Sequence, residues 1–326
     1  MGVNRLIHSL DESLANLTLP FRPGKNHLIS FLFHGLFIGP DEIASGSADP
    51  QQAITVDMFR AFVSYFKSHS YRFVSPPEIV EGLPPGEKYV LLTFDDGYYN
   101  NVRALPILQE FDVPAVFFIS TGHVKAQKAF WWDVVYRHYS KRSGRLSEMD
   151  HAIAAYKLLR THEVEGQLKK TYGDNALRPV GDSDRPFSLS ELRQFANHKY
   201  VFLGNHTMDH AILPNYSRAE IYEQINGAQE DLKEITGQVP TIIAYPNGKV
   251  SAEILQIARD AKLNLGIGVQ PGRNQLPIKT FSRHAMSLRR FTLWGDREIE
   301  QQCRVSRSDI SLYRLFRGLK HLGYSG

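Results

Sequence analysis

The sequence predicts an α/β fold that is built on a mainly parallel β-sheet. Short, almost continuously apolar runs recur along the chain, as expected of strands that are covered on both faces. Amphipathic helical patterns separate these runs, and this alternation is typical of βα units. The 326 residues, 42% of them hydrophobic, are sufficient for one large domain or two smaller ones.

Six apolar runs are the predicted strands. They are HLISFLFH (27–34), YVLLTF (89–94), AVFFIS (115–120), YVFLG (200–204), TIIAY (241–245) and LGIGV (265–269). Thr55 is the expected N-cap of one intervening helix, whose apolar stripe is Met58, Phe59, Phe62, Val63 and Phe66. Ser217 and Glu220 form a capping box for a second helix, and Gly237 is placed to end it.

Residues 128–185 interrupt this alternation, because they are helical in pattern, polar and poor in strand signals. We expect a helical insertion that packs on one end of the sheet, where inserted segments often shape a substrate site. Trp131 and Trp132 are adjacent on the first of these helices, so we expect at most one of them in the core. The other is a candidate surface for stacking on a sugar, and packing of both tryptophans onto the sheet is the alternative.

Composition and charge exclude several classes of protein. There is no apolar run of about 18 residues that would predict a transmembrane helix, and the N-terminus lacks the hydrophobic segment of a signal peptide. The single cysteine, Cys303, excludes an internal disulfide and a multi-cysteine metal site. The net charge of +4 is a weak indication of nucleic-acid binding, and no such motif is present. We therefore expect a cytoplasmic protein without a nucleic-acid partner.

The basic excess gathers at the C-terminus, where we expect a helix over residues 304–326. Its apolar face is Leu312, Leu315, Phe316 and Leu319, and its basic residues are Arg314, Arg317, Lys320 and His321. Two interpretations stay open: the helix closes the fold, or it makes a peripheral contact with the inner face of a membrane.

The motif TFDDG (93–97) follows a predicted strand with two adjacent carboxylates, Asp95 and Asp96. Carboxylates this close disfavour each other's ionisation unless a cation, a shared proton or abundant water compensates. A solvated turn is the alternative for this motif when it is considered alone.

The segment LGNHTMDH (203–210) also ends a predicted strand and carries His206 and His210. One helical turn between them would put both imidazoles on the same side, a spacing that suits a divalent transition metal. The carboxyl ends of strands meet at the edge where α/β enzymes assemble their active sites. Two histidines and one carboxylate leave a fourth metal position for water, as in catalytic zinc sites.

These two motifs resemble those of the polysaccharide deacetylase family, also called carbohydrate esterase family 4. The resemblance implies that Asp95 is the catalytic base and that Asp96, His206 and His210 bind the metal. It implies Zn²⁺ as the metal, with Co²⁺, Ni²⁺ or Mn²⁺ as alternatives. It also implies a distorted (β/α) barrel with fewer than eight strands, which we expect as one catalytic domain over residues 1–326.

The motif AYPNG (244–248) resembles a Tyr-Pro-x-Gly variant of the family's third motif. This resemblance implies that the Tyr245 backbone N–H helps to form an oxyanion hole, and that Pro246 and Asn247 contact the substrate. A plain Pro-Asn-Gly turn is the alternative.

The family's general acid and base-orienting arginine are not found in their usual motifs. In the branch that includes biofilm poly-N-acetylglucosamine deacetylases the motifs are circularly permuted, and His34 in FLFHGL then matches the general acid. A core histidine at that position, or His284 as the acid, is the alternative. Arg283 is the candidate to orient Asp95 in place of the missing arginine.

We therefore expect metal-dependent N-deacetylation of an N-acetylated sugar, such as a surface polysaccharide, a glycolipid or a precursor of either. An amidohydrolase or deformylase acting on another small amide is the alternative enzyme. A catalytically silent sugar-binding protein is the alternative outside enzymes, but such a protein has no need of two carboxylates beside two histidines. The sequence predicts neither the sugar nor the oligomeric state.

Overall fold

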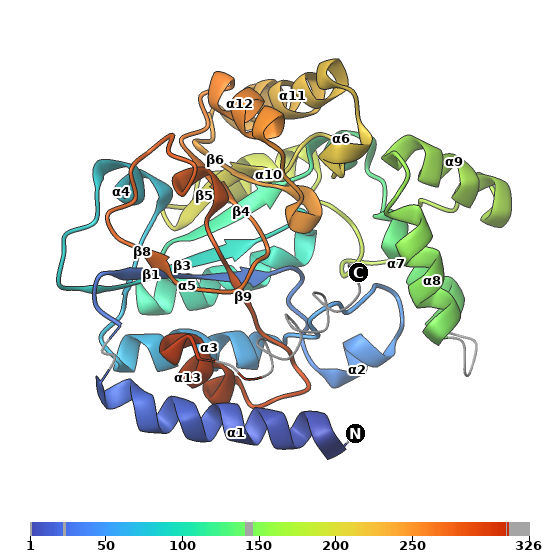
Figure 1. The fold of residues 1–326 in the computed structure, drawn as a ribbon. Helices are drawn as coiled ribbons and strands as arrows, with labels where there is room; N and C mark the ends of the chain where they lie inside the picture. Colours follow the sequence, from blue (N-terminus) through green and yellow to red (C-terminus); the bar gives the residue numbers. More distant parts are fainter. Residues whose placement is uncertain (1, 22–23, 141–145, 311, 313–326) are drawn as a thin grey trace, which may run out of the picture.

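The β-sheet determines where the polar residues that follow the strands come together. The computed structural model describes residues 2–21, 24–140, 146–310 and 312. The strands are β1 (His27–Phe33), β2 (Arg72–Phe73), β3 (Lys88–Phe94), β4 (Ala115–Ile119), β5 (Val201–Asn205), β6 (Ile242–Ala244), β7 (Leu265–Ile267), β8 (Asn274–Gln275) and β9 (Phe291–Thr292). Their order is β7-β6-β5-β4-β3-β1-β8, with β2 paired to β3 and β9 paired to β1 (Figure 1).

All neighbouring strands from β7 to β1 are parallel, and only β8 at the edge is antiparallel. The six predicted strands all form, each within two residues of its expected ends. The three that were not predicted, β2, β8 and β9, have two residues each, too few to show a periodic pattern. The main path of seven strands with its surrounding helices is a half-barrel. This architecture confirms the predicted distorted (β/α) barrel with fewer than eight strands.

The larger helices pack on one face of the curved sheet, and the other face is filled mainly by side chains of the strands themselves. The helices are α1 (Gly2–Thr18), α2 (Pro40–Ala44), α3 (Val56–Ser68), α4 (Pro76–Glu81), α5 (Leu105–Phe111), α6 (Thr121–Ala126), α7 (Trp131–Ser140), α8 (Leu146–Tyr156), α9 (Thr161–Tyr172), α10 (Leu189–Ala196), α11 (Arg218–Thr236), α12 (Ala252–Asp260) and α13 (Ile299–Ser308). The predicted caps are present: the Thr55 side chain accepts a hydrogen bond from the Met58 N–H, and Ser217 and Glu220 form their capping box. Gly237 ends α11 in the left-handed conformation, with φ of 76°.

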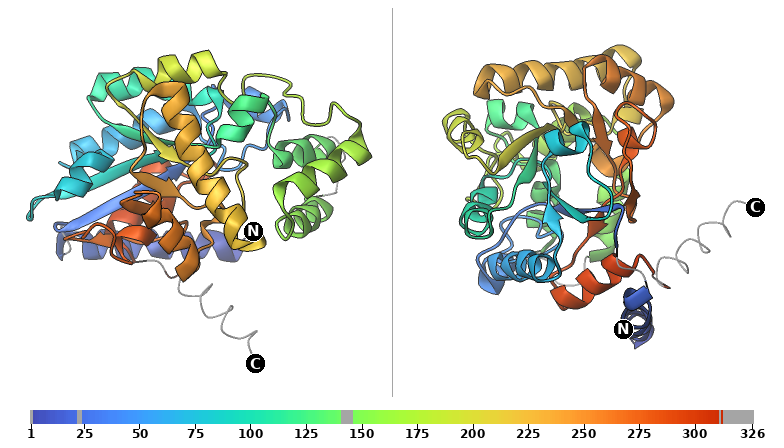
Figure 2. Two further views of the ribbon diagram at one scale, coloured as in Figure 1. Left: turned by 90° about the horizontal axis from the view of Figure 1, so that it is seen from above. Right: turned by 90° about the vertical axis from the view of Figure 1, so that its left-hand side faces the viewer.

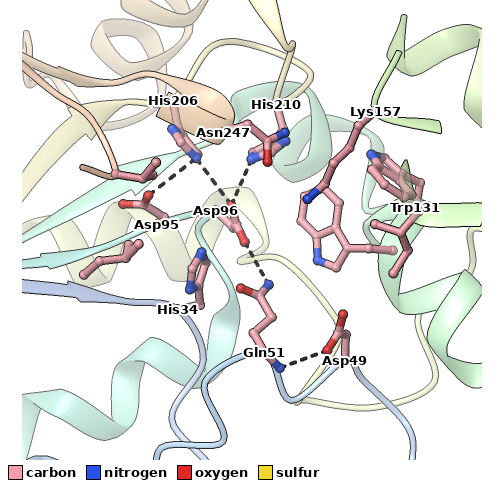
Figure 3. Close-up of a pocket in the computed structure, with 14 residues that line it drawn as sticks. His34, Asp49, Gln51, Asp95, Asp96, Trp131, Lys157, His206, His210 and Asn247 are labelled. Atoms are coloured by element: carbon pink, nitrogen blue, oxygen red, sulfur yellow. Dashed lines mark hydrogen bonds and ion pairs between the residues drawn. The ribbon is translucent and has the colours of Figure 1, made fainter. Parts of the chain in front are cut away.

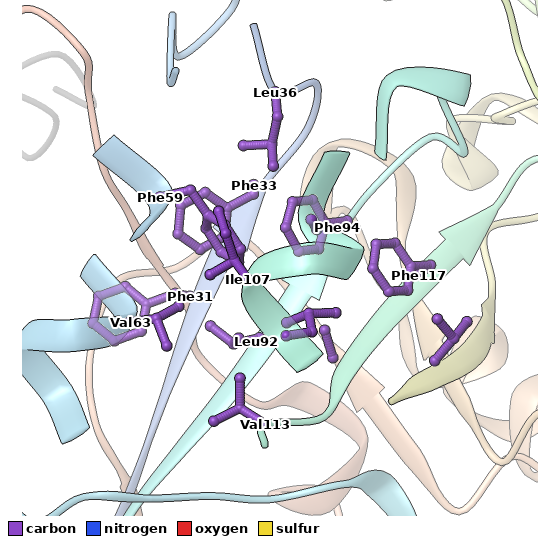
Figure 4. Packing of buried hydrophobic residues seen from close by; sticks show 14 of the residues in the cluster. Phe31, Phe33, Leu36, Phe59, Val63, Leu92, Phe94, Ile107, Val113 and Phe117 are labelled. Carbon is purple, nitrogen blue, oxygen red and sulfur yellow. The ribbon is translucent and has the colours of Figure 1, made fainter. Parts of the chain in front are cut away.

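A layer of aromatic rings fixes the strands that lead to the polar edge of the sheet (Figure 4). Phe33 of β1 and Phe94 of β3 stack at 5.3 Å, and Phe94 stacks on Phe117 of β4 at 4.8 Å. Phe59 of α3 packs edge-on against both Phe33 and Phe94. These rings are fully buried, and burial of each side chain contributes about 1.5–3 kcal/mol to folding. The strand ends are therefore held on a rigid base.

The segment predicted to be a helical insertion forms α7, α8 and α9, which gather at one side of the sheet (Figure 2, left). A separate hydrophobic cluster joins these helices, and Phe130 and Trp131 are part of it. The expectation that at most one tryptophan is buried is wrong, because Trp131 and Trp132 are 4% and 8% exposed.

The predicted basic helix over residues 304–326 falls mostly outside the described residues. In the part of the chain that is described, α13 ends at Ser308 and packs against α1 and α3. Within the described ranges, no helix combines the length and the hydropathy that crossing a bilayer requires.

Candidate active site

Asp95 and Asp96 directly follow β3, and the backbone turns their side chains in different directions. The Asp95 N–H donates to the Phe33 carbonyl at 2.9 Å, which extends the β1–β3 ladder by one residue. Asp96 then adopts φ of 76°, and Gly97 adopts φ of 86°. A left-handed conformation at a residue other than glycine costs about 1–3 kcal/mol and is maintained where the surroundings require it. The two carboxylates consequently have different partners, which resolves their repulsion.

His206 and His210 do not lie on a helical turn, so that part of the sequence prediction is wrong. The chain leaves β5 through an irregular bend in which Thr207 and His210 have φ of 63° and 49°. The Thr207 hydroxyl closes this bend by accepting a hydrogen bond from the Ala211 N–H at 2.8 Å. The bend still brings the two imidazoles together, with 4.8 Å between their ring centroids.

Asp96, His206 and His210 form a cluster that fits a divalent cation (Figure 3). Asp96 Oδ1 lies 3.4 Å from Nε2 of each histidine, without hydrogen-bond geometry. His206 Nδ1 lies 2.7 Å from the Ala244 carbonyl oxygen and therefore donates to it. In the neutral ring Nε2 is then unprotonated, so its lone pair faces the Asp96 oxygen. Acceptors that face each other in a buried place need a cation between them, and an Nδ1–H bonded to a carbonyl is the usual support of a metal-binding histidine.

The pKa shifts of this cluster also suit metal binding. Burial lowers the pKa of His210 to about 3, so this imidazole is neutral at physiological pH. Burial opposes ionisation of Asp96, but the neighbouring histidines outweigh it and hold its pKa below the usual value. Burial likewise opposes charge on His206, yet the carboxylates of Asp96 and Asp95 raise its pKa. The carboxylates thus attract positive charge to this position.

Arg290, and not Arg283, orients Asp95. The Arg290 guanidinium donates from both terminal nitrogens to the two Asp95 oxygens, at 2.6 and 2.8 Å. It also donates to the Thr93 hydroxyl and, through Nε, to the Gly268 carbonyl. Arg290 directly precedes β9, which pairs with β1 beside Asp95's own strand, whereas Arg283 is exposed. The prediction of Arg283 is therefore wrong.

The ion pair with Arg290 determines the charge of Asp95. Burial raises the pKa of Asp95, but the guanidinium and the nearby imidazoles outweigh burial, and the net pKa lies below the usual value. Asp95 is therefore a carboxylate throughout the physiological pH range, with Oδ2 4.0 Å from His206 Nε2.

His34 follows β1 and lines the same pocket as the carboxylates (Figure 3). Gln52 fixes its ring: the amide Nε2 donates to the Leu32 carbonyl, so Oε1 accepts from His34 Nδ1–H at 2.8 Å. This leaves His34 Nε2 as the ring nitrogen that can exchange a proton. The alternative residue, His284, is exposed, bonds to the Gln275 carbonyl and does not line this pocket.

The predicted role of the Tyr245 N–H is wrong. This N–H donates to the Ile267 carbonyl at 3.2 Å, so it belongs to the ladder between β6 and β7. Pro246 is buried and does not line the pocket, whereas Asn247 does. Asn247 has φ of 55° and lies in the turn that the Gly248 N–H closes on the Tyr245 carbonyl, at 2.7 Å. The motif is thus a turn that brings Asn247, and not Tyr245, to the pocket.

The pocket has a volume of about 270 Å³ and is shared by strand ends and inserted helices. Its wall is formed by Leu32, His34, Asp49, Gln51, Asp95, Asp96, Trp131, Trp132, Ile153, Lys157, His206, His210, Asn247 and Val269. Asp49, Gln51 and Lys157 were not predicted, since no local motif marks them; they reach the pocket only through the fold. Gln51 Nε2 donates to Asp96 Oδ2 at 3.4 Å.

Trp132 connects the inserted helices to the candidate metal ligands. Its ring packs against His210 with 4.6 Å between centroids, and its Nε1–H donates to the Tyr98 hydroxyl at 2.8 Å. The Tyr98 hydroxyl donates to Asp133 Oδ2 at 2.9 Å, and Asp133 Oδ1 accepts from the Asp49 N–H at 2.8 Å. This chain of bonds fixes one wall of the pocket.

Comparisons with known proteins agree with the fold. The family model described as "Polysaccharide deacetylase" matches residues 82–266, which is more than half of the chain. The Bacillus subtilis protein YxkH, whose name assigns it provisionally to the polysaccharide deacetylases, is 22% identical over 66% of this chain and 58% of its own length. The chain therefore matches less than two thirds of that relative.

Solved structures share the architecture at low sequence identity. The deacetylase PplD of Streptococcus pyogenes superposes with a TM-score of 0.59 at 19% identity, over 86% of this chain and 98% of that one. IcaB of Ammonifex degensii superposes with a TM-score of 0.55 at 17% identity, over 86% of this chain and 97% of that one.

Proposed function

The chain belongs to the polysaccharide deacetylase family, and from this premise we propose that it hydrolyses the N-acetyl group of a sugar with the help of a bound divalent cation, most simply Zn²⁺. One observation carries the proposal: Nε2 of His206 and Nε2 of His210 each lie 3.4 Å from Asp96 Oδ1, beside an Asp95 carboxylate that Arg290 keeps charged. A protein that only binds sugar has no evident need of a second buried carboxylate, held in a fixed direction by an arginine, next to a cation site.

Asp96, His206 and His210 would hold the cation. A divalent cation in such a site supplies Lewis-acid chemistry, which lowers the pKa of a water molecule and polarises an amide carbonyl. Asp95 would accept a proton from a water molecule while the oxygen of this water forms a bond to the acetyl carbon. Arg290 occupies both Asp95 oxygens and so fixes the direction of the carboxylate.

The tetrahedral intermediate needs a donor for its oxyanion, and the Asn247 N–H is the candidate. Asn247 lies in the tight turn that the Gly248 N–H closes on the Tyr245 carbonyl, and it lines the pocket. Removal of one oxyanion donor typically costs about 2.7–4 kcal/mol of transition-state stabilisation.

His34 would complete the reaction as the general acid. The C–N bond breaks only if the nitrogen is protonated, because an amide anion is a very poor leaving group. His34 Nδ1–H is held by Gln52, so the proton would leave from Nε2, and the products would be a free amino sugar and acetate.

The substrate we propose is an N-acetylated sugar of a surface polysaccharide, a glycolipid or a precursor of either. A pocket of about 270 Å³ is at the small end of ligand pockets, which suits one sugar unit rather than a long stretch of polymer.

The test combines metal analysis with product analysis. The protein is stripped with a chelator, reloaded with Zn²⁺, Co²⁺, Ni²⁺ or Mn²⁺, and assayed for acetate and formate release from N-acetylated and N-formylated amino sugars. We expect one equivalent of metal and metal-dependent acetate release. Metal binding without release of either acid would leave a sugar-binding protein as the better assignment, and formate release alone would assign a deformylase.

A further inference from the structure

The pocket has two chemically different walls (Figure 3). One wall carries Asp95, Asp96 and the histidines, which follow strands of the sheet. The other wall comes largely from the inserted helices: Trp131 and Trp132 from α7, Ile153 from α8, and Lys157 just beyond α8. A sugar whose acetamide lies at the first wall would present its other substituents to the second.

Lys157 is held firmly in place by its backbone. Its N–H donates to the Ile153 carbonyl at 3.0 Å and continues the ladder of α8. Its carbonyl accepts from Asn215 Nδ2 at 3.1 Å, and the same amide group donates to the Leu159 carbonyl at 2.9 Å. Farther along, the Thr161 hydroxyl donates to the Asp209 carbonyl at 3.0 Å. The lysine is therefore tied to the segment that carries His210.

The Lys157 ammonium has no ion-pair partner among the residues that the structure describes, within the usual limit of 4.0 Å. Burial lowers the pKa of Lys157, and the charge of Asp49 opposes this shift. Asp49 also lines the pocket and its charge acts on Lys157, but the two form no ion pair, and Asp49 Oδ1 accepts from the Gln51 N–H at 2.9 Å. The Lys157 ammonium lines the pocket without an ion-pair partner among the described residues, so it is available to a ligand.

We propose that Lys157 forms a subsite for an anionic group on the sugar substrate, a phosphate ester or a carboxylate. This inference rests on the proposed function, because it assumes that the acetamide of a sugar lies against the opposite wall. An ammonium group binds such anions as a point charge with rotatable N–H donors, and it tolerates differences in their geometry. Trp131 and Ile153 line the pocket beside it, and because Lys157 is exposed, salt can screen its attraction for an anion.

The test compares three sugars: N-acetylglucosamine 1-phosphate, N-acetylmuramic acid and neutral N-acetylglucosamine. Their affinities for the metal-free protein are measured by calorimetry, which needs no turnover. Hydrogen bonds to charged groups are worth about 1.5–3 kcal/mol, so we expect one or both anionic sugars to bind at least about tenfold more tightly than the neutral sugar. The preferred anion identifies the source of the charge, and raised salt should reduce the preference.

Lys157→Met keeps the aliphatic stem and removes the charge, and we expect it to reduce the preference to about twofold or less. Lys170→Met, at an exposed position of α9 in the same insertion, is the matched control and should keep the full preference. Asp49→Asn separates a ligand subsite from an internal charge pair. Removal of the facing acid should strengthen binding of the anionic sugar, whereas a lysine that serves only Asp49 would show no such gain.

The inference is overturned if neither anionic sugar binds more tightly than the neutral one, including the case in which no sugar binds. It is also overturned if Lys157→Met keeps the preference of the natural protein. An anion preference that depends on Lys157 in a protein that releases no acetate or formate would uphold the subsite and reject the proposed reaction.

Discussion

Arg290 and Asp95 are 195 residues apart in the sequence, yet two parallel hydrogen bonds of 2.6 and 2.8 Å join them in the interior. This geometry is the strongest form of a guanidinium–carboxylate pair. The pair links an early and a late part of the sequence. Arg290 directly precedes β9, and β9 pairs with β1, the strand that leads to His34. Both Arg290 and His34 lie outside residues 82–266, the segment that matches the family model.

Arg290→Gln should shift the acid limb of the pH–rate profile to higher pH. The guanidinium holds the pKa of Asp95 down against burial, so its loss lets burial raise the pKa, and the base becomes protonated at a higher pH. Breaking a buried pair also destabilises a protein by about 3–5 kcal/mol. The checks are kcat/KM against pH at a temperature where the variant is folded, and chemical denaturation.

Arg283→Gln is the control for this experiment, because Arg283 is exposed and does not contact Asp95. The assignment of Arg290 would be contradicted if the Arg283 variant showed the shift and the Arg290 variant did not.

Asp95→Asn should lower kcat by at least about 100-fold, the typical minimum for loss of a general base, while bound metal stays near one equivalent. The amide keeps the shape of the carboxylate but cannot accept the proton. His206→Ala should lose both activity and metal, since it removes one of three proposed ligands. Elemental analysis of folded protein, checked by circular dichroism, separates the two variants; loss of metal from Asp95→Asn would make Asp95 a ligand.

The chemistry at the strand ends could be predicted from the sequence because it is local. Asp95 and Asp96 follow β3, His206 follows β5, and parallel strands bring such positions to one edge. Arg290 could not be predicted in the same way. It depends on a two-residue strand whose pairing with β1 no pattern in the sequence records.

Two other errors concern backbone geometry. The spacing of His206 and His210 fits a helical turn, but the left-handed conformations at Thr207 and His210 produce an irregular bend instead. The predicted strand at 241–245 already included Tyr245, and its N–H does bond to the neighbouring strand, at the Ile267 carbonyl, so it is not free for an oxyanion. Hydrogen-bond registers of this kind come from tertiary packing, and they are not encoded in a short motif.

Asp133→Asn should change how stability depends on pH. Burial, and the charges of Asp49 and Asp184, raise the pKa of Asp133 well above its usual value. A raised folded-state pKa gives stability that is complete below the unfolded pKa of about 3.9 and is lost as pH rises through the folded value. The asparagine variant lacks this loss. The difference between its free energy of unfolding and that of the natural protein should therefore shift in favour of the variant as the pH rises above about 4. Urea denaturation at several pH values measures the difference, and a difference that is constant with pH would contradict the assignment.

His34→Gln should impair amide hydrolysis far more than hydrolysis of an activated ester. An amine must be protonated as it leaves, but 4-nitrophenolate leaves without protonation, so only the amide needs a general acid. We expect kcat/KM for an N-acetylated sugar to fall by about 10²–10⁴, the usual contribution of such a group, and kcat/KM for 4-nitrophenyl acetate to fall only a few-fold.

Two further variants make this comparison decisive. Asp95→Asn should impair both substrates, because each reaction requires removal of a proton from water. His284→Gln should match the natural protein on both, since His284 is exposed and does not line the pocket. An equal loss on amide and ester in His34→Gln would mean that His34 positions the substrate or Gln52, to which its Nδ1–H is bonded, and does not deliver the proton.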